Sequence, residues 1–132
     1  MAIIGLGTDI VEIGRIEQSL LRSPGLVKRV LTATEQQHFS KHTLASQPLA
    51  SRYFAKRFAA KEAAAKALGT GIGRGVSFQH IEISNDQHGR PELKFTGYAA
   101  ELATRLGVSH CWLSLSDEQA YAMATVILEG QS

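Results

Sequence analysis

Two acidic side chains stand in stretches that are otherwise apolar, and they are the first candidates for chemistry. Asp9 lies in residues 3–13, which alternate like a β-strand with apolar residues on both faces. Glu62 lies in the alanine-rich residues 51–68, at the edge of the apolar stripe that this stretch would present as a helix. An unpaired carboxylate in either place is costly. Each therefore needs a cation, hydrogen-bond donors or access to water.

The chemistry open to this pair depends on whether the two carboxylates meet. Lys66 lies one helical turn after Glu62 and can neutralise it. From spacing alone, an aspartate bonded to the backbone and a Glu62–Lys66 surface pair explain the pattern better than a metal site does. If Asp9 and Glu62 converge, the oxygen-only ligand set favours Mg²⁺ over Zn²⁺. Water and substrate phosphates would then fill the remaining ligand positions.

A glycine-rich loop follows the alanine-rich helix. Residues 69–75 read GTGIGRG, with Gly69 where a glycine that ends a helix belongs. The loop follows a helix and does not join a strand to a helix, so it is neither a dinucleotide fingerprint nor a P-loop. Its backbone amides could still bind an anion. Lys61, Lys66 and Arg74 are close enough in sequence to add positive charge.

The order of the predicted elements indicates a fold class. We expect helices at residues 14–21, 26–31, 34–39, 51–68 and 98–106, with Thr34 as an N-cap and a polar loop at 41–48. We expect strands at residues 3–13, 81–84, 92–95, 111–115 and 121–128. Strands and helices do not alternate strictly, so the prediction is an α+β fold in one domain, residues 1–132.

The first strand has features of its own. Because both of its faces are apolar, we expect it to lie in the centre of its sheet. Gly5 and Gly7 weaken its intrinsic strand preference, and we expect them to allow a close backbone approach or a bulge.

Composition and charge exclude several classes of protein. Hydrophobic residues make up 44% and charged residues 20%, as in ordinary globular domains. The net charge of +2 is too small to indicate nucleic acid. Basic residues do gather at positions 52–66, where they could meet phosphates, an acidic partner or only solvent.

The sequence also indicates the cellular compartment of the protein. Cys111 is the one cysteine, so no disulfide forms within the chain. No run approaches the roughly 18 apolar residues of a membrane-spanning helix, and the first residues do not resemble a signal peptide. We expect a cytoplasmic protein with no membrane or nucleic-acid partner.

Two sequence blocks together resemble a known family. Residues 5–13, GLGTDIVEI, followed by RIE at 15–17, are similar to the first signature of the holo-acyl-carrier-protein synthases, in the 4′-phosphopantetheinyl transferase superfamily. Residues 58–72, FAAKEAAAKALGTGI, are similar to their second signature. GRP at 89–91 and YAMATVILE at 121–129 resemble the family as well. The resemblance covers most of the chain and is weakest over residues 18–51.

The resemblance implies a fold and a reaction. The fold would be the single-domain 4′-phosphopantetheinyl transferase fold, with a mixed or antiparallel sheet and a long central helix. The reaction would move the 4′-phosphopantetheine group from coenzyme A to a serine of apo acyl carrier protein in fatty acid biosynthesis, with release of adenosine 3′,5′-bisphosphate. The family also implies a homotrimer with its active sites at subunit interfaces.

The resemblance assigns roles to individual residues. Asp9 and Glu62 would hold Mg²⁺ and, with Lys66, form the catalytic group, in which Lys66 stabilises the departing phosphate. The residues expected to lie beside coenzyme A are Lys61, Lys66, Gly69, Thr70, Gly71 and Ile72. Arg15 and Arg22 would dock the acidic recognition helix of the carrier protein.

One position departs from the family pattern. Trp112 stands where many relatives carry a histidine, and an indole N–H only donates. His110 lies on the same strand face, about 7 Å along the strand. We therefore assign no catalytic histidine. The serine proton would pass to Asp9, to Glu62 or to a metal-bound water that they polarise.

Three other functions remain open from the sequence. The chain could modify carrier proteins of polyketide or peptide synthesis, although the broad-specificity relatives are built as two similar halves. A non-catalytic module could bind nucleotides or an acidic protein, but simple docking needs no magnesium site. A small nucleic-acid binder would show a steeply salt-dependent affinity.

Overall fold

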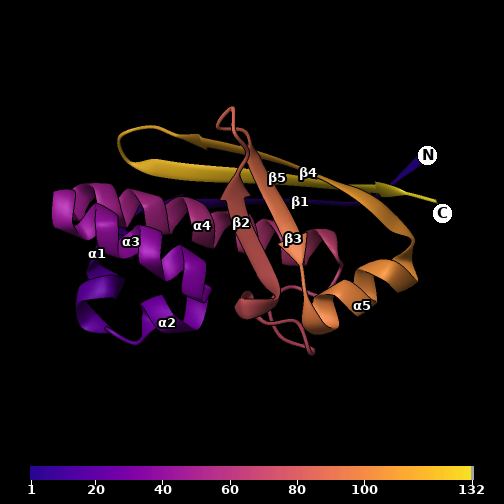
Figure 1. Cartoon of the computed structure of the whole chain (residues 1–132), viewed down its shortest axis with the longest axis horizontal. Helices are drawn as coiled ribbons and strands as arrows, with labels where there is room; N and C mark the ends of the chain where they lie inside the picture. The colour runs from indigo at the N-terminus through magenta and orange to yellow at the C-terminus, as the bar shows by residue number, and fades with distance from the viewer. Residues whose placement is uncertain (132) are drawn as a thin grey trace.

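The computed structural model describes residues 1–131 and has the predicted α+β class. Three long antiparallel strands form one sheet in the order β1–β5–β4, where β1 is Ala2–Glu12, β5 is Tyr121–Gly130 and β4 is Val108–Asp117. A separate two-stranded sheet is a hairpin of β2 (Ile81–Asn85) and β3 (Pro91–Phe95). In Figure 1 the three long strands run together along one side of the molecule, and the hairpin crosses them steeply.

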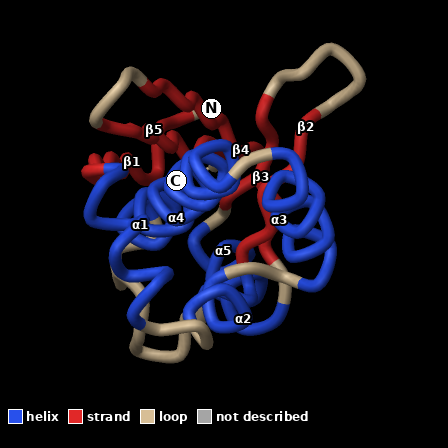
Figure 2. Tube along the Cα trace, turned by 90° about the vertical axis from the view of Figure 1, so that its left-hand side faces the viewer, coloured by secondary structure: helices blue, strands red, loops and turns tan. Residues whose placement is uncertain are grey.

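The helices cover one face of the three-stranded sheet. The longest is α4 (Gln47–Ala67), which packs against both β1 and β5. The others are α1 (Ile13–Arg22), α2 (Leu26–Val30), α3 (Ala33–Ala45) and α5 (Gly97–Leu106), with a 3₁₀ turn at Phe78–His80. Figure 2 shows them gathered on one side of that sheet. Within residues 1–131 no helix is long and apolar enough to cross a membrane.

Glycines allow β1 to lie directly against α4. A Cβ atom at Gly5 would lie 1.9 Å from the carbonyl oxygen of Ala67, and one at Gly7 would lie 1.9 Å from that of Ala63. Neither position can carry a side chain without moving the helix. The expected close approach is therefore confirmed, and the expected bulge lies between Ile3 and Gly5. This contact places the residues that follow Gly7 beside the second half of α4.

The expectation that β1 is a central strand is wrong. Over residues 1–131, β1 pairs only with β5 and forms an edge of the sheet. Its outward side chains Leu6 and Ile10 are 63% and 61% exposed. Apolar residues on both faces usually indicate burial on both faces, but in the single chain only the face toward α4 is covered.

The helical boundaries differ from the prediction between residues 32 and 50. The N-cap is Thr32, not Thr34, and it forms a capping box with Glu35. The polar segment 41–48 is mostly helical, because α3 continues to Ala45 and only Ser46 separates it from α4. Ser46 caps α4 by accepting a hydrogen bond from the Leu49 N–H. Exposed polar residues in a helix lack the apolar periodicity by which the helix would have been predicted.

Candidate active site

Asp9 and Lys66 meet where β1 lies along α4. Asp9 is on the β1 face that carries Gly7 and Val11, and its side chain is 17% exposed. The Lys66 ammonium donates to Asp9 Oδ1 at 3.1 Å and to the Thr8 carbonyl oxygen at 3.0 Å. The Lys66 side chain stays half exposed. Its amine is thus held beside the aspartate and remains accessible from solvent.

Glu62 joins the same cluster. Burial raises the pKa of the Glu62 carboxyl above its usual value, the negative charge of Asp9 raises it further, and Lys66 opposes both effects. Glu62 lies one turn before Lys66 on α4, and Lys66 is bonded to Asp9, so the three side chains share one neighbourhood. A carboxyl group held beside a second carboxylate forms a site whose negative charge a cation would offset. The structure therefore brings together all three residues predicted to be catalytic.

The donor atoms in this cluster fit a magnesium ion. Among residues 1–131 no group of three or more His, Cys, Asp or Glu side chains could enclose a metal. Asp9 and Glu62 thus supply only carboxylate oxygens, and few of them. Mg²⁺ commonly binds to one or two carboxylates and keeps water and phosphate oxygens as its other ligands. A metal ion that takes all of its ligands from protein side chains would not fit here.

The glycine loop begins where α4 ends, directly after Lys66. The N–H groups of Thr70 and Gly71 both donate to the Ala65 carbonyl oxygen, which closes the helix. Backbone φ angles in the left-handed region occur at Gly69, Gly71, Gly73, Arg74 and Gly75. This conformation suits glycine and turns the chain sharply. The predicted coenzyme A positions 69–71 are therefore adjacent to the Lys66 turn, while Ile72 packs against the hydrophobic core.

Lys61 does not belong to this surface. Its side chain is 0% exposed, and its ammonium donates to Glu35 Oε1 at 2.6 Å, to the Val30 carbonyl at 2.7 Å and to the Phe78 carbonyl at 3.2 Å. Burial lowers the pKa of the Lys61 amine, and the Glu35 carboxylate opposes that shift. The predicted contact of Lys61 with coenzyme A does not fit this placement. Its three acceptors come from the protein itself.

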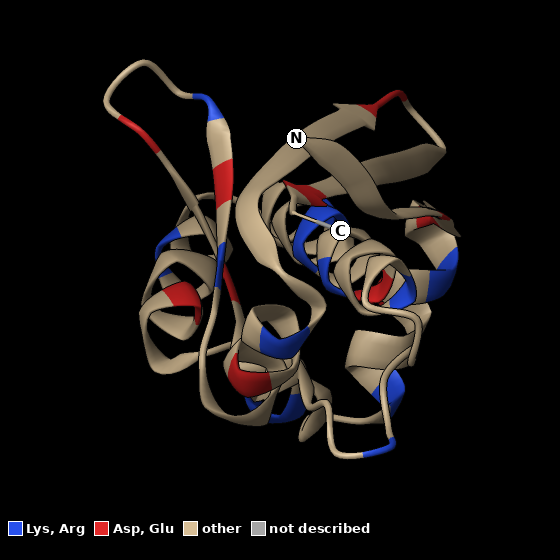
Figure 3. Ribbon diagram, turned by 90° about the vertical axis from the view of Figure 1, so that its right-hand side faces the viewer, with Lys and Arg blue, Asp and Glu red and all other residues tan. Residues whose placement is uncertain are grey.

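The two predicted docking arginines lie on α1, which follows β1 directly. Arg15 is well exposed and places its Nε 3.4 Å from Glu12 Oε1. It borders a cavity of about 420 Å³ that Ile10 and Tyr121 also line. Arg22 is exposed in the last turn of the helix. In Figure 3 the ribbon is blue at the Lys and Arg positions, several of which lie on the helices.

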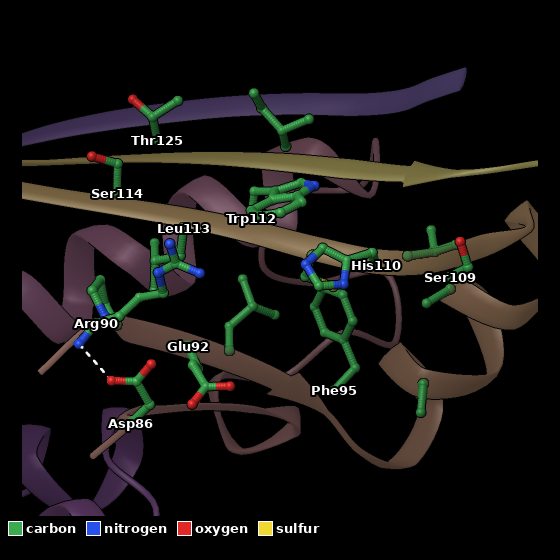
Figure 4. Close-up of a pocket in the computed structure, with 17 residues that line it drawn as sticks. Asp86, Arg90, Glu92, Phe95, Ser109, His110, Trp112, Leu113, Ser114 and Thr125 are labelled. Atoms are coloured by element: carbon green, nitrogen blue, oxygen red, sulfur yellow. Dashed lines mark hydrogen bonds between the residues drawn. The ribbon is translucent and has the colours of Figure 1, made fainter. Parts of the chain in front are cut away.

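The sequence did not predict a groove of about 670 Å³ between β3 and β4. In Figure 4 the rings of His110 and Trp112 project from β4 toward it, and Arg90 lies at its other end. The two ring centroids are 4.2 Å apart, and Trp112 Nε1 donates to Glu129 Oε1 at 3.1 Å. No local pattern could reveal this groove, because β3 and β4 approach each other by packing and not through strand pairing.

A second cavity, of about 530 Å³, is lined by basic side chains of α4. Arg57 is 7% exposed and donates to Asn85 Oδ1 at 3.0 Å, and its guanidinium lies 4.4 Å from the centre of the Tyr53 ring. Arg52 and Lys56 approach the Asp117 carboxylate at 2.8 and 3.5 Å. The basic segment noted in the sequence thus lines a cavity, with part of its charge already neutralised.

This fold and site are those of a known family. The family model described as the 4'-phosphopantetheinyl transferase superfamily matches residues 5–126, and the chain belongs to this superfamily. The chain is 56% identical, over 129 residues and 98% of each chain, to the holo-[acyl-carrier-protein] synthase of Pseudoalteromonas atlantica.

Two solved structures show the same likeness. The synthase of Neisseria meningitidis is 40% identical, with a TM-score of 0.85, and the match covers 97% of this chain and 99% of that one. The synthase of Bacillus anthracis, solved in complex with CoA (3',5'-ADP), is 38% identical, with a TM-score of 0.79 and 98% of each chain covered. The fold that the two sequence signatures imply is therefore confirmed.

Proposed function

We propose that this protein is a holo-acyl-carrier-protein synthase. It transfers the 4′-phosphopantetheine group of coenzyme A to a serine of apo acyl carrier protein and releases adenosine 3′,5′-bisphosphate, a step that fatty acid biosynthesis requires. The observation that carries this proposal is the meeting of Asp9, Glu62 and Lys66 at the contact of β1 with α4. Relatives similar over nearly the whole chain bear the same enzyme name.

Each residue of the cluster has its own role in the phosphoryl transfer. The serine oxygen attacks the β-phosphorus of the coenzyme A pyrophosphate, and the bond from that phosphorus to the bridging oxygen breaks. Mg²⁺ held by Asp9 and Glu62 would neutralise charge on the pyrophosphate oxygens. Lys66, fixed by Asp9 but half exposed, donates to the phosphate that departs. The serine proton passes to a carboxylate, and Glu62 is the freer of the two, because Lys66 is bonded to Asp9.

Coenzyme A and the carrier protein would approach from different elements. We assign the pyrophosphate to the half-exposed ammonium of Lys66, and we place coenzyme A along the loop of residues 69–71, whose own amides already donate to carbonyl oxygens of α4. The cavity lined by Arg52, Lys56 and Arg57 offers a further place for phosphate groups. The carrier would dock on α1, where Arg15 and Arg22 are exposed and can pair with acidic side chains.

We further propose a homotrimer in the cytoplasm. The sheet face turned away from α4 carries large exposed apolar side chains: Leu6, Ile10, Trp112, Tyr121 and Met123. A contiguous apolar patch of this kind marks an interaction surface. Three copies of the chain would cover it and bring further residues to each site.

The test is the mass of purified apo acyl carrier protein after incubation with coenzyme A, Mg²⁺ and this protein. Wild type should add one phosphopantetheine group, whereas Asp9→Ala and Glu62→Ala should slow the transfer by on the order of 10²–10⁴-fold. Lys41→Ala, on the exposed surface of α3, is the control and should act like wild type.

His110→Ala belongs in the same assay. No histidine takes the serine proton in this proposal, so most of the activity should remain, and a loss on the order of a thousandfold would contradict that assignment. The function itself would be refuted if folded wild-type protein added no mass while a known synthase modified the same carrier.

A further inference from the structure

The buried pair of Glu35 and Lys61 takes no part in the proposed transfer. The two side chains are 1% and 0% exposed. The Lys61 ammonium has acceptors on three different segments: Glu35 of α3, the Val30 carbonyl at the end of α2, and the Phe78 carbonyl in the 3₁₀ turn. One side chain of α4 thereby holds three separate parts of the chain.

Glu35 extends the same network to two more groups. Its Oε1 accepts from the Thr32 N–H at 2.8 Å, and its Oε2 accepts from the Ile83 N–H of β2 at 2.7 Å. Both oxygens and the ammonium are therefore satisfied, which offsets much of the cost of removing two charges from water. A fully bonded buried network of this kind has one geometry and resists small displacements.

This network fixes α4 on the side opposite the sheet. At about 100° per residue, Lys61 lies about 160° around the helix from Ala63, which contacts Gly7. Glu62 and Lys66 lie about 100° and 140° from Lys61, between the two contacts. The helix cannot rotate about its axis without breaking either the contact with β1 or the bonds of Lys61.

We propose that Lys61 and Glu35 are positioning residues for Glu62, and that they act by fixing the rotation of α4. This inference rests on the proposed function, in which Glu62 and Asp9 hold the metal ion. A rotation of about 20° moves a side-chain tip roughly 6 Å from the helix axis by roughly 2 Å. Mg²⁺ demands near-octahedral geometry with bonds of about 2.0–2.1 Å. Such a displacement separates the two carboxylates enough to lose shared binding of one ion.

The decisive variant is the double replacement Glu35→Leu with Lys61→Met. An apolar pair in place of a buried ion pair is often neutral for stability. Here it also leaves the Val30 and Phe78 carbonyls and the Thr32 and Ile83 N–H groups without their partners, so we expect a less stable variant and measure its folded fraction first. The single changes Lys61→Met and Glu35→Gln accompany it. Lys41→Met removes an exposed lysine of α3 and is the matched control.

Binding of Mn²⁺, as a paramagnetic substitute for Mg²⁺, is measured by electron paramagnetic resonance, without turnover. Thermal unfolding and the Mg²⁺ half-saturation of the transfer are measured in parallel. The folded double variant should bind Mn²⁺ about 10-fold more weakly than wild type, as is typical when the support of a metal ligand is removed. Its Mg²⁺ half-saturation should rise to a similar extent, and Lys41→Met should match wild type.

A folded double variant that binds Mn²⁺ as tightly as wild type would overturn the inference, even if its maximal rate fell. A purely structural role would lower the folded fraction of the protein but not the metal affinity of the molecules that remain folded. If the double variant does not fold, Glu35→Gln, which keeps the shape of the side chain, decides by the same comparison. If the proposed function itself were wrong, the observation would differ, because wild type would then transfer no phosphopantetheine.

Discussion

At the scale of the residue, the protonation of Glu62 links stability to the proposed binding of a metal ion. Its pKa is raised by burial and by the Asp9 charge in the folded state. A carboxyl with a raised folded pKa favours the folded state below its unfolded pKa, and this contribution is lost as the pH rises through the folded pKa. At neutral pH the ionised Glu62 therefore destabilises the metal-free protein, and a bound cation offsets that effect.

Replacing this charge should stabilise the metal-free protein. In EDTA at pH 7, Glu62→Gln should unfold at a midpoint roughly 1–4 °C above wild type. The difference should disappear near pH 4, about the unfolded pKa of a glutamate, because wild type is then neutral at this position. Mg²⁺ should raise the midpoint of wild type but not that of the variant. Thermal unfolding followed by circular dichroism measures all three effects.

Glu101→Gln, on the exposed surface of α5, is the matched control and should show no such pH dependence. If Glu62→Gln were less stable than wild type at pH 7 without metal, the raised pKa could not be the dominant effect of this side chain.

At the scale of the element, the short distance between β1 and α4 assembles the site. Gly5 and Gly7 remove the side chains that would hold the strand away from Ala67 and Ala63. Asp9 follows two residues after Gly7, so the same contact brings its carboxylate within reach of Lys66. Any change that separates the two elements should therefore weaken both the fold and the site.

Gly7→Ala tests this contact. Its new Cβ would lie 1.9 Å from the Ala63 carbonyl oxygen, and backbone on both sides would have to shift. We expect a loss of about 3 kcal/mol or more in the free energy of unfolding, measured by urea denaturation.

Gly14→Ala is the control, because a Cβ there meets nothing within 4 Å and the residue lies in α1. It should stabilise the protein by about 0.5–1 kcal/mol, since alanine is the better helix former. Equal effects of the two substitutions would show that the close approach is not what limits stability.

At the scale of the whole molecule, the sheet has one covered face and one open face. The face toward α4 is buried through Ala122, Ala124, Val126 and Leu128 of β5. The opposite face exposes large apolar residues at the edge strand and in the middle of the sheet, among them Leu6 and Met123. A single chain leaves this area in contact with water, which favours association through this face.

Leu6→Glu should therefore disrupt the proposed trimer. A carboxylate buried at such an interface without a partner costs several kcal/mol, so light scattering should give the mass of a monomer, with a marked loss of transfer activity. Leu44→Glu is the control, because Leu44 is 89% exposed on α3, away from the sheet. A monomeric wild type, or an unchanged mass for Leu6→Glu, would contradict the proposal.

The sequence by itself determined the class of the fold and which residues were candidates for the site. Asp9, Glu62 and Lys66 were identified from their placement in apolar or helical stretches and from two signatures. Most strands and helices followed from local periodicity, and Gly69 ends α4 as predicted because glycine alone adopts positive φ without cost.

Only the tertiary structure decided which faces are covered and where Lys61 points. β1 resembles a buried strand in its composition, yet it is an edge, because strand order depends on pairing with residues more than a hundred positions away. The acceptors of Lys61 lie 17, 26 and 31 residues from it along the chain. Contacts over such separations leave no local periodicity that could correct the family resemblance, which assigns Lys61 to coenzyme A, whereas folding satisfies its charge in the interior.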